Sequence, residues 1–200
     1  MEVAGLVLAA GAGRRYGMPK ALVAYHGELL VQRAARTLRE AGCARTVVVL
    51  GAQAARVRTA APGLCGPGPV CAVENPDWPS GMGSSLRAGL AALDGTPAVA
   101  AVVLLVDMPG VTAAAVRRVT GYAAADALVV GGYGDRRGHP VLLGRDHWAA
   151  VATTATGDRG ARDHLRAHAD RVRVVAVGDV ADDTDLDEPP VGRRSEDAGA

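Results

Sequence analysis

Residues 99–109 read VAAVVLLVDMP, an apolar run that ends in an acidic residue and a proline. A continuous aliphatic run is typical of a strand that is covered on both faces, so we expect this segment at the centre of a parallel sheet. Ligands of open α/β sheets bind at the carboxyl ends of the strands. Asp107 is therefore predicted to face a ligand crevice and to bind a metal ion. The alternative is that it caps a helix beginning near Thr112.

Apolar runs and Ala-rich segments of helical length alternate on both sides of this central run, which predicts a parallel sheet with helices on both faces. The predicted strands are residues 4–8, 46–50, 70–73, 99–106, 127–130, 140–143 and 172–177. The predicted helices are residues 28–41, 84–93, 112–124 and 160–169. In the first helix, Arg33, Arg36 and Arg39 should point away from the sheet. The expected fold class is α/β, with three α/β/α layers and a mostly parallel, mixed sheet.

Length and composition exclude several kinds of protein. Two hundred residues, 49% apolar and 22% charged, suit a single domain, predicted as residues 1–191, before a tail at 192–200 predicted to be disordered. The net charge of +1 provides no general attraction to nucleic acid or to an anionic membrane. No segment has the length of a membrane span or the pattern of a secretory signal, so we expect a cytoplasmic protein. The three cysteines match neither a zinc motif nor a redox motif.

A glycine-rich turn, LAAGAGRRYGMPK at residues 8–20, follows the first predicted strand. Its glycines let the backbone approach a bulky anion, and Arg15 and Lys20 add positive charge where a triphosphate would lie. The glycine spacing and Pro19 exclude the dinucleotide fingerprint, and no Gly-Lys-Ser/Thr forms a Walker A loop. A flexible turn with surface charges is the alternative. The nucleotide-binding residues predicted here are Leu8, Ala9, Ala10, Gly11, Ala12, Gly13, Arg15 and Lys20.

A second loop, NPDWPSGMGSSL at residues 75–86, runs into a predicted helix. The free N–H groups at a helix start and the hydroxyls of Ser84 and Ser85 suit a base edge or a ribose, while helix capping alone would also explain Ser84. We therefore predict that Gly81, Gly83, Ser84 and Ser85 bind the nucleotide.

The acidic run DDTDLDEPP at residues 182–190 is a further candidate. Such a run is usually a solvated loop. Mg²⁺, however, prefers one or two carboxylates together with substrate phosphates, so a carboxylate from this run could complete a site at Asp107. Two more residues are candidates for binding an anionic acceptor: His139 in GHP (138–140) and Arg162 in GDRGAR (157–162).

Together these segments resemble the molybdenum cofactor cytidylyltransferase family, within the MobA-like group of Rossmann-like nucleotidyltransferases. The matching stretches are residues 8–20, 81–86, 106–109, 138–140, 157–162 and 185–189, in the family's order. The family's loop has the form L-A-A-G-x-S-x-R-M-G-x-P-K. Arg15 and Lys20 match its cations, whereas Gly13 replaces the Ser and Tyr16 the Met. The pair Ala9-Ala10 is similar to the cytidylyltransferase form, since the guanylyltransferase branch typically has Gly at the second position.

The resemblance implies CTP and molybdopterin as substrates, pyrophosphate as a product, and Mg²⁺ as the cofactor. It implies catalytic roles for Arg15, Lys20 and Asp107, and Asp187 as the second metal ligand, with Asp183 and Asp185 as alternatives. The product would serve a molybdenum hydroxylase or its maturation factor. Another nucleotide, a sugar-phosphate or polyol-phosphate acceptor, or a nucleotide-binding chaperone without catalysis are the alternatives. Catalysis requires Lys20 and Asp107 to lie together.

Overall fold

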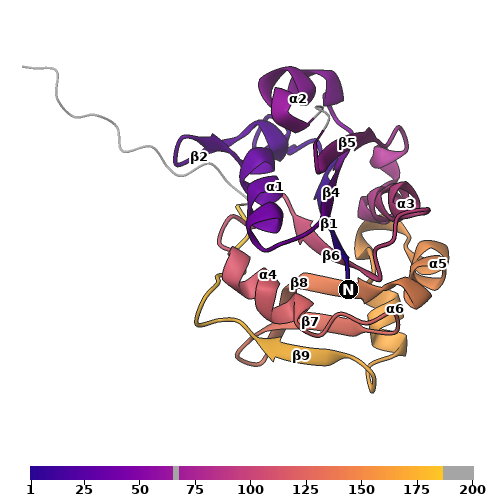
Figure 1. Ribbon diagram of the computed structural model, residues 1–200. Coiled ribbons are helices and arrows are strands. Elements are labelled where there is room, and N and C mark those ends of the chain that lie inside the picture. Colours follow the sequence, from indigo (N-terminus) through magenta and orange to yellow (C-terminus); the bar gives the residue numbers. More distant parts are fainter. Residues whose placement is uncertain (65–67, 187–200) are drawn as a thin grey trace, which may run out of the picture.

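The computed structural model describes residues 1–64 and 68–186, which form a seven-stranded sheet between two layers of helices (Figure 1). The strand order is β5-β4-β1-β6-β8-β7-β9, and every pairing is parallel except those of β8. The strands are β1 Val3–Ala9, β4 Arg45–Leu50, β5 Val70–Glu74, β6 Ala100–Leu105, β7 Leu128–Tyr133, β8 Arg136–Gly144 and β9 Arg173–Ala176. A small hairpin adds β2 Ala24–Tyr25 and β3 Glu28–Leu29. The predicted α/β fold with a mostly parallel, mixed sheet is confirmed.

Helices cover both faces of the sheet, with α1 and α4 on the left of Figure 1 and α3, α5 and α6 on the right. The core residues of α2 belong with those of α1 and α4. The α-helices are α1 Leu30–Glu40, α2 Ala54–Ala60, α3 Met82–Leu93, α4 Ala113–Thr120, α5 Arg145–Thr154 and α6 Arg162–Ala167. The 3₁₀ turns are η1 Lys20–Leu22, η2 Pro62–Leu64, η3 Trp78–Ser80 and η4 Gly157–Arg159.

Strand β6 occupies the middle of the sheet, as its apolar run predicts. Ala100, Val102 and Leu104 pack on the α1 and α4 side. Ala101 and Val103 pack on the α3 and α5 side. Because successive side chains of a strand point to opposite faces, a strand buried on both sides needs apolar residues throughout. The chain leaving β6 therefore emerges at the carboxyl edge of the sheet.

The predicted helix boundaries need correction at two places. Glu28 and Leu29 belong to β3, because His26 and Gly27, both with positive φ, turn the chain into a hairpin before α1. Thr112 caps α4 by accepting a hydrogen bond from the N–H of Ala115, but that helix ends at Thr120 and not near residue 124.

Helices α2 and α5 were absent from the prediction. Only Ala54 and Val57 are buried in α2, and the buried side chains of α5 are His147, Trp148 and Val151. Neither helix therefore carries the long apolar stripe that makes a helix visible in a sequence.

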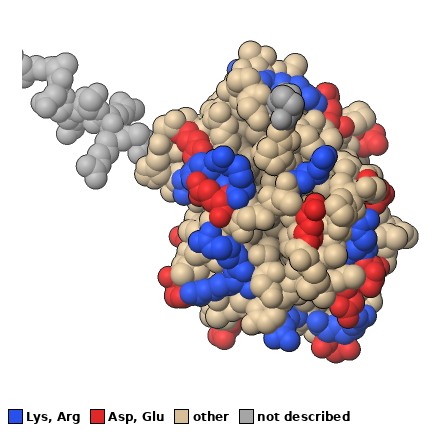
Figure 2. All heavy atoms as spheres, in the orientation of Figure 1, with Lys and Arg blue, Asp and Glu red and all other residues tan. Residues whose placement is uncertain are grey.

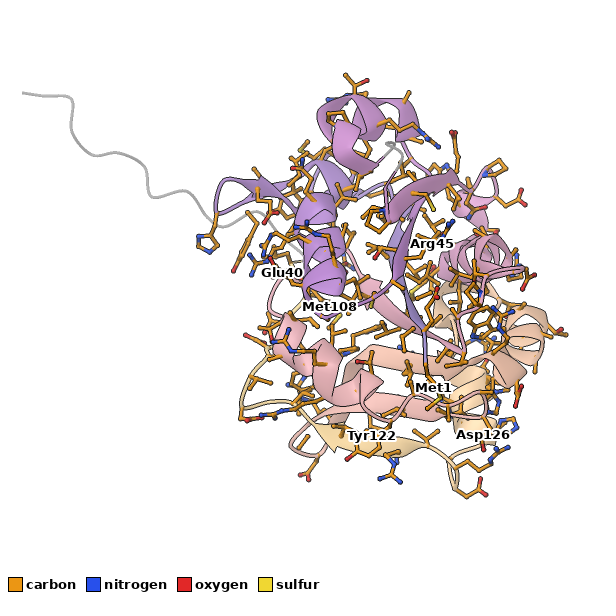
Figure 3. The ribbon with its side chains drawn as sticks, in the orientation of Figure 1. Met1, Glu40, Arg45, Met108, Tyr122 and Asp126 are labelled. Carbon is orange, nitrogen blue, oxygen red and sulfur yellow. The ribbon has the colours of Figure 1, made fainter. Side chains whose placement is uncertain are left out.

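Arg33 is partly buried and makes contacts within the protein. Its Nε donates to the carbonyl oxygen of Pro109 at 3.0 Å, and its guanidinium lies 5.4 Å from the centre of the Tyr25 ring. Met108, just before this contact, packs between α1 and α4 (Figure 3). Helix α1 thus supports the segment that follows Asp107.

The surface carries both signs of charge. Figure 2 shows acidic and basic side chains interspersed over one face, in keeping with the net charge of +1. None of the helices in the described part of the chain is both long and apolar enough to cross a bilayer.

Candidate active site

Lys20 and Asp107 meet at the carboxyl edge of the sheet. Lys20 begins η1 and Asp107 follows β6, and the Lys20 Nζ lies 2.8 Å from the Asp107 Oδ2. Their side chains are 16% and 23% exposed, so a ligand has access to both. The requirement that the glycine-rich turn and the acid after the central strand lie together is therefore met, although they are 87 residues apart in the sequence.

The glycine-rich turn presents mainly its backbone. The side chains of Leu8, Ala9 and Ala10 are buried in the two cores. Gly13 has φ +59°, and a Cβ there would lie 2.0 Å from the carbonyl oxygen of Met18. The turn therefore folds back on itself at a position that only glycine can occupy without a shift.

Arg15 forms no hydrogen bond or ion pair with Lys20 or Asp107. It is exposed on the turn and makes no hydrogen bond or ion pair with the rest of the described chain. The side chain is available to an anion, and its predicted contact with a triphosphate stays a prediction.

Ser84 and Ser85 are held by hydrogen bonds within the protein, and their predicted contact with a base or ribose stays a prediction. Both are only 4% exposed. The Asn75 amide donates to both hydroxyls, at 2.8 and 3.1 Å, and the Ser84 hydroxyl also lies within 2.9 Å of the carbonyl oxygens of Asp77 and Gly81. These bonds hold the loop before α3 in shape. Asn75 was not singled out from the sequence, because nothing local marks an asparagine that bonds to residues nine and ten positions later.

Gly81 and Gly83 permit a close backbone contact. A Cβ at Gly81 would lie 2.5 Å from the carbonyl carbon of Gly157, and one at Gly83 would lie 2.7 Å from that of Ala155. The segment leading into η4 therefore packs directly on the start of α3. This contact places the arginines of η4 and α6 beside the end of the central strand.

A cleft of about 580 Å³ opens beside the end of β6. Its floor is apolar and includes Leu8, Leu86, Val103, Val130, Val141 and Leu143. Five arginines also line it, namely Arg136, Arg137, Arg159, Arg162 and Arg166. Both predicted acceptor-binding residues, His139 and Arg162, line this cleft. A pocket with an apolar floor and a cationic wall suits an anionic ligand with an apolar body.

Three of these arginines are paired with a carboxylate, and two are not. Arg159 and Arg166 lie 3.0 and 4.0 Å from the carboxylate of Asp163, and Arg136 lies 2.9 Å from that of Asp183. The guanidinium groups of Arg137 and Arg162 have no hydrogen-bond or ion-pair partner among the described residues. Arg137 did not stand out in the sequence, since its value depends on where the β7–β8 hairpin places it.

His139 lines the cleft as an uncharged side chain. Burial lowers its pKa to about 4, and the nearby negative charge of Asp107 opposes this only in part. The imidazole is therefore neutral near pH 7. Its backbone carbonyl oxygen accepts a 2.6 Å hydrogen bond from the Tyr133 hydroxyl, which fixes the local chain.

The chain after β9 returns across the carboxyl edge and is fastened to the loop that follows Asp107. The Thr112 hydroxyl donates to the Val180 carbonyl oxygen at 2.8 Å, the Asp182 N–H donates to that of Gly110 at 3.1 Å, and the Leu186 N–H donates to that of Asp107 at 2.9 Å. Asp183 and Asp185 line the cleft from this segment. The predicted second metal ligand, Asp187, lies outside the described residues, as does the predicted tail.

The donor set at Asp107 suits a metal ion that arrives with phosphates. In the described ranges, no three His, Cys, Asp or Glu side chains are grouped as a metal-binding cluster. Asp107 contributes a partly exposed carboxylate next to Met108, which lines the cleft. Mg²⁺ is commonly held by one or two carboxylates plus substrate phosphates, so the residues present fit such an ion.

A central strand that ends in a carboxylate, facing a cationic glycine turn and a cleft with an arginine wall, is the arrangement of a Rossmann-like nucleotidyltransferase. Comparison with known proteins agrees. Residues 5–172 match the family described as the MobA-like NTP transferase domain, and the chain belongs to this family.

Several known proteins are similar to this chain. "Nicotine blue oxidoreductase" of Paenarthrobacter nicotinovorans is 39% identical over 193 residues, which is 92% of each chain. A "Probable molybdenum cofactor guanylyltransferase" of Opitutus terrae is 39% identical over 116 residues, 56% of this chain and 51% of its own. The crystal structure of Rv0371c from Mycobacterium tuberculosis has a TM-score of 0.76 and 32% identity, and covers 92% of this chain and 93% of its own. A structure of Rv0371c in complex with manganese is also similar, with a TM-score of 0.75 at 30% identity and coverage of 93% of this chain and 94% of its own.

Proposed function

We propose that this protein transfers CMP from CTP to molybdopterin and releases pyrophosphate, with Mg²⁺ as its cofactor. The observation that carries the proposal is the Lys20–Asp107 pair beside the cleft with the arginine wall. The pair supplies a cation for phosphates and a carboxylate for the metal ion. His139 lines the cleft, and the negative charge of Asp107 opposes the lowering of its pKa by burial.

In the proposed reaction, a phosphate oxygen of the acceptor attacks the α-phosphorus of CTP, and the bond from that phosphorus to the bridging oxygen of the β-phosphate breaks. Lys20 and Arg15 balance the charge of the departing pyrophosphate. Asp107 and Asp187 would hold Mg²⁺, which when bound neutralises charge on the phosphates. Arg137 and Arg162 orient the acceptor. The product would pass to a molybdenum hydroxylase or its maturation factor.

The lining of the cleft favours molybdopterin over a sugar or polyol phosphate. A polyol would place hydroxyls against the aliphatic floor, where they would lose hydrogen bonds to water without replacement. A pterin ring offers a flat face to that floor and a phosphate to the arginines. The presence of both Lys20 and Asp107, in contact, favours catalysis over a chaperone that only binds nucleotide.

Measurement of pyrophosphate release with each of the four nucleoside triphosphates and molybdopterin tests the proposal. We expect release with CTP, and a loss of about a hundredfold in Lys20→Ala, equal to ~3 kcal/mol, without unfolding. If release requires GTP, the transferred nucleotide is GMP and not CMP, in line with the guanylyltransferase name of the Opitutus terrae relative. Release with a sugar phosphate in place of molybdopterin would correct the acceptor. A Lys20→Ala rate equal to the wild-type rate would contradict the active-site assignment.

A second candidate function rests on the relative named "Nicotine blue oxidoreductase", because it is similar over 92% of both chains. In that case the cleft would hold a flat dye, and a hydride from a reduced nicotinamide nucleotide together with a proton would reduce it. The test is oxidation of NADH or NADPH in the presence of nicotine blue. Dye-dependent oxidation without pyrophosphate release under any nucleotide would replace the transferase proposal.

A further inference from the structure

Lys20 and Asp107 form a partly buried ion pair. The contact is made by side-chain atoms alone, at 2.8 Å. The backbones on both sides are held by other bonds: the Lys20 carbonyl oxygen accepts from the Val23 N–H at 3.0 Å, and that of Asp107 accepts from the Leu186 N–H at 2.9 Å. The pair can therefore open through side-chain rotation, without displacing the turn or the strand.

An ammonium group at this position opposes a bare divalent cation. The cation would have to share one carboxylate with Lys20 and would meet a like charge close by. The described part of the chain offers no cluster of three His, Cys, Asp or Glu that would compensate with further ligands. Asp107 is thus a poor site for a divalent ion while Lys20 holds it.

A triphosphate removes both obstacles. Its oxygens give Lys20 a new partner of higher negative charge, and they supply the oxygen ligands that a divalent cation lacks at Asp107. Opening the pair then replaces the contact between Lys20 and Asp107 by an interaction of each with the same ligand.

We infer that Lys20 is a latch on Asp107, which keeps the divalent cation out until a nucleoside triphosphate draws the lysine away, so that cation and nucleotide bind together. This inference rests on the proposed roles of Lys20 and Asp107 in the transferase. Because coupling between two ligands is reciprocal, the cation strengthens nucleotide binding by the same factor as the nucleotide strengthens cation binding.

Binding of Mn²⁺, followed by the electron paramagnetic resonance of the free ion, tests the latch without any turnover. Without nucleotide, Lys20→Met is expected to bind Mn²⁺ about tenfold more tightly than the wild type. A non-hydrolysable CTP analogue is expected to tighten Mn²⁺ binding about tenfold in the wild type and much less in Lys20→Met. Arg14→Gln is the matched control, since it removes the same charge from the same exposed turn and is expected to bind Mn²⁺ as the wild type does.

Equal Mn²⁺ affinity in the wild type and Lys20→Met, without nucleotide, overturns the latch. If Lys20→Met and Arg14→Gln bind Mn²⁺ more tightly than the wild type by the same factor, the latch is also overturned, because the change in net charge would then be the cause. The double variant Lys20→Met, Asp107→Asn distinguishes a wrong latch from a wrong proposed function, because it tests whether Asp107 binds the metal ion at all. Loss of Mn²⁺ binding there places the ion at Asp107 and supports the latch, whereas unchanged binding removes Asp107 as the metal ligand. Circular dichroism of each variant verifies that it is folded.

Discussion

The glycine-rich turn and the cleft beside it are built in opposite ways. The turn is one continuous stretch, residues 8–20, whose shape depends on its own backbone and on Gly13. The cleft takes its lining from residues between Leu8 and Asp185, on β1, α3, β6, β7, β8, η4, α6 and the C-terminal segment. The part assigned to phosphates is thus local and the part assigned to the acceptor is assembled by packing. Substitutions in the two regions should consequently affect different kinetic quantities.

The largest effect is expected at the point where the two regions meet. Asp107→Asn keeps the size of the side chain but removes its negative charge, so a divalent cation loses its ligand and Lys20 its partner. We expect pyrophosphate release to fall by about a thousandfold. Asp94→Asn, at an exposed carboxylate after α3, is the control and should retain the wild-type rate. A fall of less than tenfold in Asp107→Asn would separate this carboxylate from the chemistry.

A substitution at Gly13 tests whether the backbone shape of the turn matters. A side chain at Gly13 would collide with the Met18 carbonyl oxygen at a positive φ, whereas a Cβ at Gly63, in η2, meets no atom within 4 Å. We expect kcat/KM for the nucleotide to fall about tenfold to a hundredfold in Gly13→Val. In the control Gly63→Val it should fall about twofold or less. Similar losses in the two variants would show that the shape of the turn at Gly13 has no special role.

In the cleft, the effect should appear in the KM for the acceptor alone. Arg137 and Arg162 have no partner among the described residues, so each is available for a charge-assisted hydrogen bond to an anion. Removal of one such bond in Arg137→Gln or Arg162→Gln should raise the acceptor KM about tenfold. The nucleotide KM should not change. Arg39→Gln, at the exposed end of α1, is the control. An equal rise in the nucleotide KM would mean that the cleft does not separate the two substrates.

The smallest effect concerns the wall behind the cleft, where three histidines join α5 to α6. The His147 Nε2 lies 3.1 Å from the Asp126 carbonyl oxygen, so this nitrogen carries a proton. The other nitrogen, Nδ1, then accepts from the His164 Nε2 at 3.1 Å. Burial lowers the pKa of His164, and the neighbouring His168 and His147 lower it further. The neutral form of the group is therefore preferred in the folded protein.

Because the folded-state pKa of His164 lies below the ordinary value of 6.5, its contribution to stability is present above that pH and is lost as the pH falls through it. Between about pH 7.5 and about pH 5.5, the midpoint of urea unfolding should fall more in the wild type than in His164→Gln. Glutamine keeps a donor for the His147 Nδ1 but does not titrate. The same fall in both proteins would assign the pH dependence to other groups.

The sheet could be predicted because its signals are local. The apolar run before Asp107 identifies a strand buried on both faces, and β6 lies in the middle of the sheet. Helices α2 and α5 were missed, since few of their side chains are buried and no stripe marks them. Ser84 and Ser85 were predicted to bind the nucleotide because nothing in the sequence shows a partner for their hydroxyls. The bonds that occupy them come from Asn75 and from the carbonyl oxygens of the loop before α3.

By itself, the sequence determined the alternation of strands and helices, the glycine-rich turn, and a lysine and an aspartate of the right kinds for phosphate and metal. These features follow from periodicity and from the conformational freedom of single residues, which are properties of short stretches. Only the tertiary structure decided that Lys20 contacts Asp107, that Arg137 and Arg162 share an apolar cleft, and that the C-terminal segment fastens to the loop after β6. Contacts between residues far apart in the chain depend on packing geometry, and no short stretch of sequence contains it.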